Sequence, residues 1–205
     1  MTSTPSLILA SASPRRQELL AQIGLACRVQ PVDIDESPRT GEAPEEYVSR
    51  LARDKARTAW VRRAACDDLP VLGSDTTVVL DGRMLGKPAD GAEAERMLEG
   101  LSGRTHEVLT AVAVVRDEQE AVALSRSRVS FRPTTCAERA AYVASGEPQD
   151  KAGAYAIQGL GAVFVERLEG SYSGVMGLPL YETARLLADF GIVVPATFPD
   201  TDEVA

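Results

Sequence analysis

Short apolar runs alternate with longer amphipathic segments along this chain, and the alternation predicts an α/β protein. Runs that would be apolar on one or both faces of an extended backbone predict strands at residues 6–11, 27–36, 70–80, 83–88, 105–115, 123–132 and 161–168. Segments whose apolar residues recur every three or four positions predict helices at residues 14–24, 41–64, 92–100, 135–145 and 178–190. Because the two kinds of segment alternate irregularly, we expect a mixed twisted sheet with flanking helices.

The polarity of single segments predicts where some of these elements lie and end. Residues 105–115 are apolar on both faces, which is typical of a central strand, whereas the more polar residues 123–132 belong nearer an edge. The pair Asp81–Gly82 predicts a hairpin turn between the strands that flank it. Gly100 predicts the end of the helix that precedes it.

Composition and charge limit the kind of partner. The 205 residues are 44% hydrophobic, and we find no repeat and no linker-like stretch. We therefore expect one domain over residues 1–194 and an acidic, frayed tail at residues 195–205. The net charge of -8 does not fit a protein that binds nucleic-acid polymers through a basic surface. If the chain binds anions, a local cluster of cations must do so, for a small ligand.

The apolar runs and the cysteines predict the compartment. No apolar run is long enough for a signal or membrane segment, so we expect a cytoplasmic protein with no membrane partner. Cys27, Cys66 and Cys136 lie far apart in the sequence and form no CxxC pair, which predicts buried free thiols in a reducing compartment. The single histidine, His106, lacks an obvious catalytic partner, and a structural role is the simpler interpretation.

The segment SASPRRQELL at residues 11–20 breaks a rule of helix beginnings. Ser13 predicts the N-cap and Pro14 the first helical position, where the helix macrodipole favours acidic side chains. Arg15 and Arg16 stand there instead. Both arginines could point into solvent or pair with carboxylates elsewhere. Two arginines behind two serines at a strand-to-helix junction favour an anion site, in which guanidinium groups, hydroxyls and backbone N–H groups bind phosphate.

Charged side chains also interrupt apolar segments further along the chain. Asp75 stands within a predicted strand, where a carboxylate is costly unless it is paired, hydrogen-bonded or bound to a metal, and we favour a functional role for it. Lys55 lies on the apolar side of its helix, and a side chain that snorkels to water explains it as well as function does. The acids Asp33, Asp35 and Glu36 could hold a divalent cation, but a solvated loop is the commoner case.

Two loop segments carry candidates with less specific patterns. Lys87 precedes a proline after the predicted hairpin, and by itself it resembles an ordinary loop lysine, as does Lys151. The stretch DKAGAYAIQGLG at residues 150–161 has small residues that would let its backbone approach a flat ligand. Within it, Gln158 is a buried amide by its pattern and could read a base edge. A tight turn before the next strand explains the same stretch equally well.

Taken in order, five segments resemble the Maf family of nucleoside triphosphate pyrophosphatases. They are LASASPRRQELL, YVSRLARDKA, VLGSDTTVVLDGRMLGKP, MLEGLSGRTHEVLTAVAVV and YVASGEPQDKAGAYAIQGLGAVFVERLEGSYSGVMGLPLYET. The resemblance covers the chain from Leu7 to about Ile192. It implies a fold related to the inosine-triphosphate pyrophosphatases, with two lobes around a deep cleft, and a homodimer. It also implies cleavage of a nucleoside triphosphate to the monophosphate and pyrophosphate with Mg²⁺ or Mn²⁺.

The resemblance assigns roles residue by residue. Asp75 matches the carboxylate taken as the general base, and together with Glu36 it matches the acids near the metal. The positions that hold phosphates are matched by Ser13, Arg15, Arg16, Lys55 and Lys87. The positions at which subgroups of the family differ are matched by Arg15, Thr76 and Gln158, and this set resembles the subgroup that acts on dTTP and UTP.

Alternatives to this expectation come from two classes of protein. One is the same chemistry on 7-methyl-GTP or on modified pyrimidine nucleotides, which would also remove unwanted nucleotides. The other is a nucleotide-binding regulator of septum formation that binds without turnover. Two residues depart from the family pattern, Ser74 before the aspartate and Gly174 near the C-terminal helix, and we expect neither to touch the chemistry.

Overall fold

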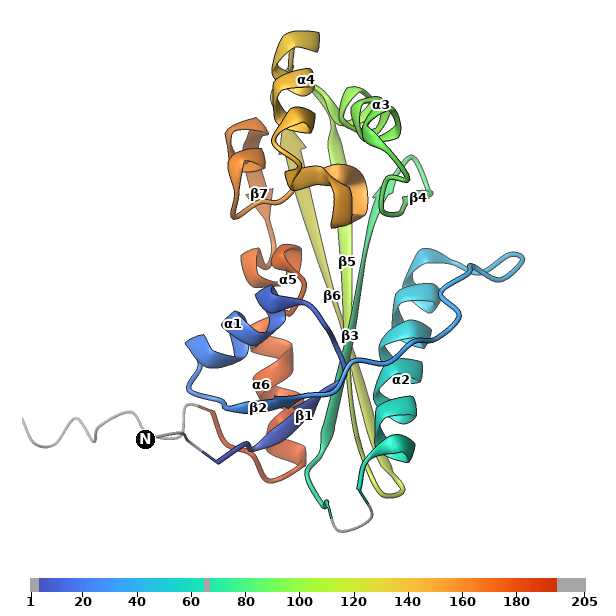
Figure 1. Ribbon diagram of the computed structural model, residues 1–205, viewed down its shortest axis with the longest axis vertical. Coiled ribbons are helices and arrows are strands. Elements are labelled where there is room, and N and C mark those ends of the chain that lie inside the picture. Colours follow the sequence, from blue (N-terminus) through green and yellow to red (C-terminus); the bar gives the residue numbers. More distant parts are fainter. Residues whose placement is uncertain (1–3, 65–66, 195–205) are drawn as a thin grey trace, which may run out of the picture.

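The computed structural model describes residues 4–64 and 67–194 and contains a mixed seven-stranded sheet flanked by helices (Figure 1). The order of hydrogen-bonded strands is β2-β1-β3-β5-β6-β7, with β4 paired to β3. Strand β1 is parallel to β2 and β3, and the remaining pairs are antiparallel, so the predicted mixed sheet is confirmed. The strands are β1 (Leu7–Leu9), β2 (Cys27–Val29), β3 (Val71–Leu80), β4 (Arg83–Leu85), β5 (Thr105–Arg116), β6 (Gln119–Phe131) and β7 (Val165–Glu169).

Helices cover both faces of this sheet. The α-helices are α1 (Pro14–Gln22), α2 (Pro44–Arg62), α3 (Gly91–Leu101), α4 (Cys136–Ala144), α5 (Tyr172–Met176) and α6 (Leu180–Asp189). Three 3₁₀ turns follow α4: η1 (Glu147–Asp150), η2 (Ala152–Ala154) and η3 (Leu160–Phe164). In the described part of the chain, no helix is both long and apolar enough to cross a membrane. Cys27 and Cys136 are free thiols, but Cys27 is half-buried and Cys136 is exposed, so the prediction that they are buried is wrong. Cys66 and the predicted tail lie outside the described residues.

The long strands β3, β5 and β6 run through the whole molecule and join its two halves (Figure 1). In one half, Ile8 packs with the apolar side of α2, whereas its neighbours Leu7 and Leu9 pack with α1 and α6 on the opposite face. In the other half, the same long strands pack against α3, α4 and the 3₁₀ turns, around Phe131 and Tyr155. Because successive side chains of a strand point to opposite faces of the sheet, the first half has one core on each face. The second half has a single core.

Helix α2 packs unusually close to β3. At Gly73, a Cβ atom would lie 2.2 Å from the Ala52 carbonyl oxygen and 2.7 Å from the Ala56 amide nitrogen. Only a residue without a side chain permits this approach of the two backbones. The predicted apolar face of α2 is buried there, including Ala52, Ala56 and Ala59.

Several predicted boundaries are wrong, each for a local reason. Strand β2 ends at Val29 rather than continuing into the acids, where Pro31 has no N–H to donate. Gly100 lies inside α3, which continues to Leu101. The strand predicted at residues 161–168 begins at Val165, because the preceding residues form η3. The predicted Asp81–Gly82 turn is confirmed, with φ values of 51° and 75°.

His106 is buried on β5, with 2% of its surface exposed. Its Nε2 atom lies 2.9 Å from the Tyr155 hydroxyl, and its ring packs edge-on against Phe131 and Tyr155. Among the described residues, Nδ1 has no hydrogen-bond partner. Burial therefore lowers the pKa of His106 from 6.5 to about 4, which agrees with a structural rather than a catalytic role.

This depressed pKa predicts a pH-dependent stability. The unfolded chain binds a proton at His106 below about pH 6.5, whereas the folded chain does so only near pH 4, so the free energy of unfolding falls as the pH drops through this window. The full effect amounts to roughly 3 kcal/mol. Urea unfolding of the wild type between pH 7 and pH 5 should reveal this slope, and His106→Gln should remove most of it. Equal slopes in the two proteins would contradict the assignment to His106.

Candidate functional site

A cavity of about 600 Å³ lies where the two halves of the molecule meet. One wall comes from the end of β1 and the start of α1, and another from the middle of β3. The opposite wall comes from the loop after β4 and from residues 150–158. Every residue to which the resemblance assigns a role lines this cavity: Ser13, Arg15, Arg16, Glu36, Lys55, Asp75, Thr76, Lys87 and Gln158.

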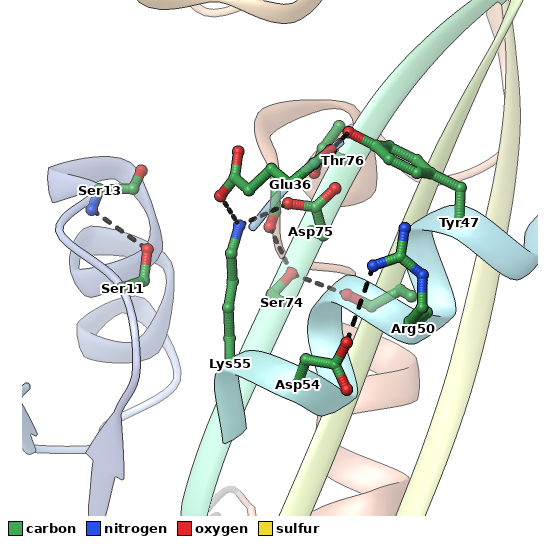
Figure 2. Close-up of polar contacts among 12 residues, drawn as sticks. Ser11, Ser13, Glu36, Tyr47, Arg50, Asp54, Lys55, Ser74, Asp75 and Thr76 are labelled. Atoms are coloured by element: carbon green, nitrogen blue, oxygen red, sulfur yellow. Dashed lines mark hydrogen bonds and ion pairs between the residues drawn. The ribbon is translucent and has the colours of Figure 1, made fainter. Parts of the chain in front are cut away.

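At the base of this cavity, the Lys55 ammonium group joins two carboxylates (Figure 2). Its Nζ atom donates to Asp75 Oδ1 at 2.7 Å and to Glu36 Oε1 at 2.6 Å. The side chains of Lys55 and Asp75 are each 11% exposed. Lys55 lies on the buried face of α2 and does not snorkel to bulk water, because its charge meets a carboxylate that β3 presents. The same contact compensates the cost of Asp75 inside an apolar strand.

Glu36 reaches this centre from the loop after β2. Burial raises the pKa of Glu36, but the hydrogen bond from Lys55 and the charges of Lys55, Lys87 and Arg16 outweigh burial, so the net pKa lies below its usual value. The Tyr47 hydroxyl donates to the Glu36 carbonyl oxygen at 2.9 Å and so fixes the backbone at this position. Burial, followed by the charges of Asp75 and Glu36, raises the pKa of Tyr47 to about 12, which keeps this phenol protonated.

Arg16 is held by hydrogen bonds from across the fold. Its Nε donates to the Gly177 carbonyl oxygen at 2.8 Å, its Nη1 to Ser11 Oγ at 3.1 Å and its Nη2 to Thr76 Oγ1 at 3.4 Å. Burial lowers the pKa of Arg16, partly offset by the charge of Asp75. A guanidinium group keeps its charge in such surroundings. Its planar fork is therefore fixed in one orientation at the cavity wall.

A second layer of hydroxyl groups supports this orientation. The Thr110 hydroxyl lies 3.0 Å from that of Thr76 and donates to the Gly174 carbonyl oxygen at 2.7 Å. Ser74 Oγ lies 2.9 Å from the Ala111 carbonyl oxygen and 3.0 Å from that of Gly177. Ser74 and Gly174, which the sequence placed apart from the chemistry, thus belong to the hydrogen bonds behind Arg16.

The predicted start of α1 is confirmed, with Pro14 as its first residue. Ser13 occupies the N-cap position, but its hydroxyl makes no cap hydrogen bond, and its own N–H donates to Ser11 Oγ at 3.2 Å. No acidic side chain occupies the first turn. Arg15 extends toward residues 150–158, and its Nη1 lies 3.8 Å from Asp150 Oδ2. A free hydroxyl and two guanidinium groups therefore surround a positive helix end.

The opposite wall carries Lys87 and Gln158. Lys87 is exposed on the loop after β4. Gln158 is also exposed, so the prediction of a buried amide is wrong, because the 3₁₀ turns lift this residue to the cavity rim. Both side chains are accessible to a ligand in the cavity, whereas Asp75 and Lys55 lie at its base.

Some residues of the cavity wall were missed by sequence reasoning. They include Tyr47, Val78, Val108, Asp150, Lys151 and Tyr155. Tyr47 and Tyr155 belong to apolar patterns that predict only a core, and no signal distinguishes them. Lys151 was interpreted as an ordinary loop lysine. Of the predicted acidic cluster only Glu36 lines the cavity, whereas Asp35 accepts a hydrogen bond from the Ser37 N–H in an exposed turn.

The pair Asp75 and Glu36 fits a divalent cation that also binds a substrate. Both carboxylates reach one ammonium group, so their oxygens already converge on one cation. Among the described residues, no three His, Cys, Asp or Glu side chains form a group that could hold a metal. Mg²⁺ is usually held by one or two carboxylates together with phosphate oxygens and water, so two acids beside a phosphate-sized cavity suffice.

Comparisons with known proteins agree with this geometry. A family model described as Maf-like protein matches residues 6–190. The chain is 56% identical over 191 residues to a dTTP/UTP pyrophosphatase of Methylobacillus flagellatus, covering 93% of this chain and 96% of that protein. It is 54% identical over 201 residues to a dTTP/UTP pyrophosphatase of Bordetella avium, covering 95% and 100%. Among solved structures, the Ham1 protein of Staphylococcus aureus aligns with 61% of this chain and 71% of its own, at 17% identity and a TM-score of 0.39.

The Lys55 contacts predict how Glu36 titrates. Lys55→Met removes the hydrogen bond and the nearest positive charge, so the pKa of the Glu36 carboxyl should rise. Lys87→Met removes a charge but no hydrogen bond to Glu36, so it should raise that pKa less and serves as the matched control. Carboxyl NMR of the ligand-free protein measures both. A Glu36 pKa that stays at its wild-type value in folded Lys55→Met would refute the arrangement.

Proposed function

Since the chain belongs to the Maf family, we propose that it hydrolyses dTTP and UTP to the corresponding monophosphate and pyrophosphate. The relatives that are named dTTP/UTP pyrophosphatases match almost the whole chain at more than half identity. The observation that carries the proposal is the Lys55 contact with Asp75 and Glu36 at the base of a cation-lined cavity. A triphosphate places several negative charges in such a cavity, and arginine and lysine bind them.

Asp75 is the residue best placed to activate water. Lys55 donates to its Oδ1 atom, which orients the carboxylate, while the rest of the group remains available to a water molecule. The carboxylate accepts a proton from that water as the water attacks the α-phosphorus. Arg15, Arg16 and Lys87 then stabilise the negative charge that develops on the departing pyrophosphate. Positioning and electrostatics therefore supply most of the rate enhancement.

A divalent cation, Mg²⁺ or Mn²⁺, belongs to this proposal. Asp75 and Glu36 would hold it, and when bound it supplies Lewis-acid stabilisation of phosphate charge and a more acidic water. Lys55 would offset part of the negative charge of the two carboxylates and keep them close together. The ammonium group therefore sets the positions of both side chains before a cation binds.

We assign recognition of the base to Gln158 at the cavity rim and to Thr76 on β3. Gln158 stands exposed at the rim, and its amide offers a donor and an acceptor to the pyrimidine edge. Thr76 lies beside Arg16, so the base-selecting and phosphate-binding residues share one hydrogen-bond chain. Uracil and thymine differ by one methyl group, for which an apolar pocket discriminates by only about 1–3 kcal/mol.

Removing the Asp75 carboxylate should abolish most of the turnover. Asp75→Asn keeps the shape of the side chain but cannot accept the proton, so kcat for dTTP in Mg²⁺ should fall by about 10²–10⁴-fold. Pyrophosphate release measures this. Asp117→Asn, in the turn between β5 and β6, is the matched control and should keep wild-type turnover. If Asp75→Asn works at nearly the wild-type rate, Asp75 is not the base.

A panel of triphosphates at fixed Mg²⁺ tests the substrate class. We expect comparable kcat/KM for dTTP and UTP and a lower value for CTP, whose ring presents a different pattern of donors and acceptors. Gln158→Ala should narrow the gap between UTP and CTP. Equal kcat/KM values for dTTP, UTP and CTP in the wild type would show that Gln158 does not select the base.

The same panel decides between the proposal and its alternatives. Preference for 7-methyl-GTP or a modified pyrimidine nucleotide would keep the chemistry and change the substrate. Thermal stabilisation by nucleotide with no pyrophosphate release would favour a regulator, including one of septum formation. The homodimer stays a prediction from the resemblance, and the cytoplasmic location stays a prediction from the sequence.

A further inference from the structure

The distribution of lysine in this chain is uneven. Of the 22 basic residues that are Lys or Arg, only three are lysines: Lys55, Lys87 and Lys151. All three line the same cavity. Elsewhere the chain uses arginine for its ion pairs, including those of Arg104 and Arg126 at the surface. A lysine differs from an arginine in presenting a compact ammonium group with rotatable donors, which suits contact with single phosphate oxygens.

Lys151 is held firmly against the loop that carries Lys87. The Gly153 N–H donates to the Gly86 carbonyl oxygen at 3.1 Å, which ties the two loops together. Gly153 has a φ of 68°, and a Cβ atom there would lie 2.8 Å from the Val78 side chain. The loop thus rests directly on β3. As a result, Lys87 and Lys151 lie on neighbouring loops, and both line the cavity together with Arg15 and Arg16.

Asp150 occupies the space between the two walls. Its Oδ2 atom lies 3.8 Å from Arg15 Nη1, and its Oδ1 atom accepts from Lys151 Nζ. The Asp150 side chain is 69% exposed, whereas those of Arg15 and Lys151 are 24% and 14% exposed. An exposed carboxylate can rotate into solvent at little cost, while the two cations stay in place. The carboxylate therefore has the position and charge of a phosphate bound by both walls.

We propose that Lys151 is a further substrate-binding residue, and that Asp150 holds the position between Lys151 and Arg15 until a substrate phosphate replaces it. This inference rests on the proposed function, since it names one more group that binds the triphosphate. Without substrate, Asp150 keeps the two cations from repelling each other across the cavity. With substrate bound, the same carboxylate competes with the phosphate, so it lowers the affinity for the ligand.

The test uses the full-length protein and a ligand without a base. Calorimetry with inorganic tripolyphosphate measures binding, and pyrophosphate release from dTTP measures KM and kcat. Lys151→Gln removes the cation, Lys151→Arg keeps the charge in another shape, and Asp150→Asn removes the competing carboxylate. Arg83→Gln on β4 and Asp117→Asn at the β5–β6 turn are charge-matched controls outside the cavity wall.

The Lys151→Gln and Asp150→Asn variants should change the Kd for tripolyphosphate and the KM for dTTP in opposite directions. Lys151→Gln should raise the Kd for tripolyphosphate and the KM for dTTP by about tenfold, since hydrogen bonds between charged groups are the strong ones. Lys151→Arg should keep part of the affinity. Asp150→Asn should lower both constants by about threefold, the size of a partly exposed ion pair. In Lys151→Gln, the gain from adding Asp150→Asn should shrink, and the two controls should bind as the wild type does.

Three results would overturn the proposal. Wild-type affinity for tripolyphosphate in folded Lys151→Gln would exclude Lys151 from phosphate binding. Weaker tripolyphosphate binding by Asp150→Asn would show that Asp150 positions the site and does not compete for it. An Asp150→Asn effect on dTTP alone would make Asp150 a base-contacting residue. If wild-type protein binds tripolyphosphate through Lys151 yet cleaves no nucleotide, the inference stands and the proposed function fails.

Discussion

The site depends on one buried contact, the ammonium group of Lys55 held between Asp75 and Glu36. The contact exists because α2 lies against β3 so closely that Gly73 has no room for a side chain. A wider spacing would leave the Asp75 carboxylate in an apolar sheet without a partner, at a large desolvation cost. The close packing of α2 against β3 therefore also determines where the Asp75 carboxylate lies.

A second constraint concerns the accumulation of positive charge. Arg15 and Arg16 stand at a helix end that is already positive, and Arg16 donates to carbonyl and hydroxyl oxygens, two of them from distant segments. Gly177, beyond α5, supplies its carbonyl oxygen to Arg16, so the C-terminal part of the chain completes a site that begins at β1. These neutral oxygens orient Arg16 without neutralising it, which leaves its charge for an anionic ligand.

Much of this could be predicted from the sequence, and the failures have identifiable causes. Helical spacing located α2 and its buried face, and the cost of a lone carboxylate in a strand pointed to Asp75. Between residues 147 and 164 the chain forms 3₁₀ turns, whose conformation follows from contacts such as Glu147 with the Leu160 and Gly161 N–H groups and leaves no periodicity. For that reason the sequence predicts a buried Gln158, which is exposed in the structure, and does not distinguish Lys151 from an ordinary loop lysine.

The continuity of β3, β5 and β6 has a mechanical consequence. Their pairing is unbroken from Val71 opposite Val115 to Val79 opposite Glu107, and from Thr105 opposite Ser130 to Arg116 opposite Gln119. The two walls of the cavity are therefore connected by one continuous sheet. A hinge motion between them would have to break backbone hydrogen bonds between these strands. A ligand that enters the cavity would then be accommodated by the rotation of side chains, as proposed for Asp150.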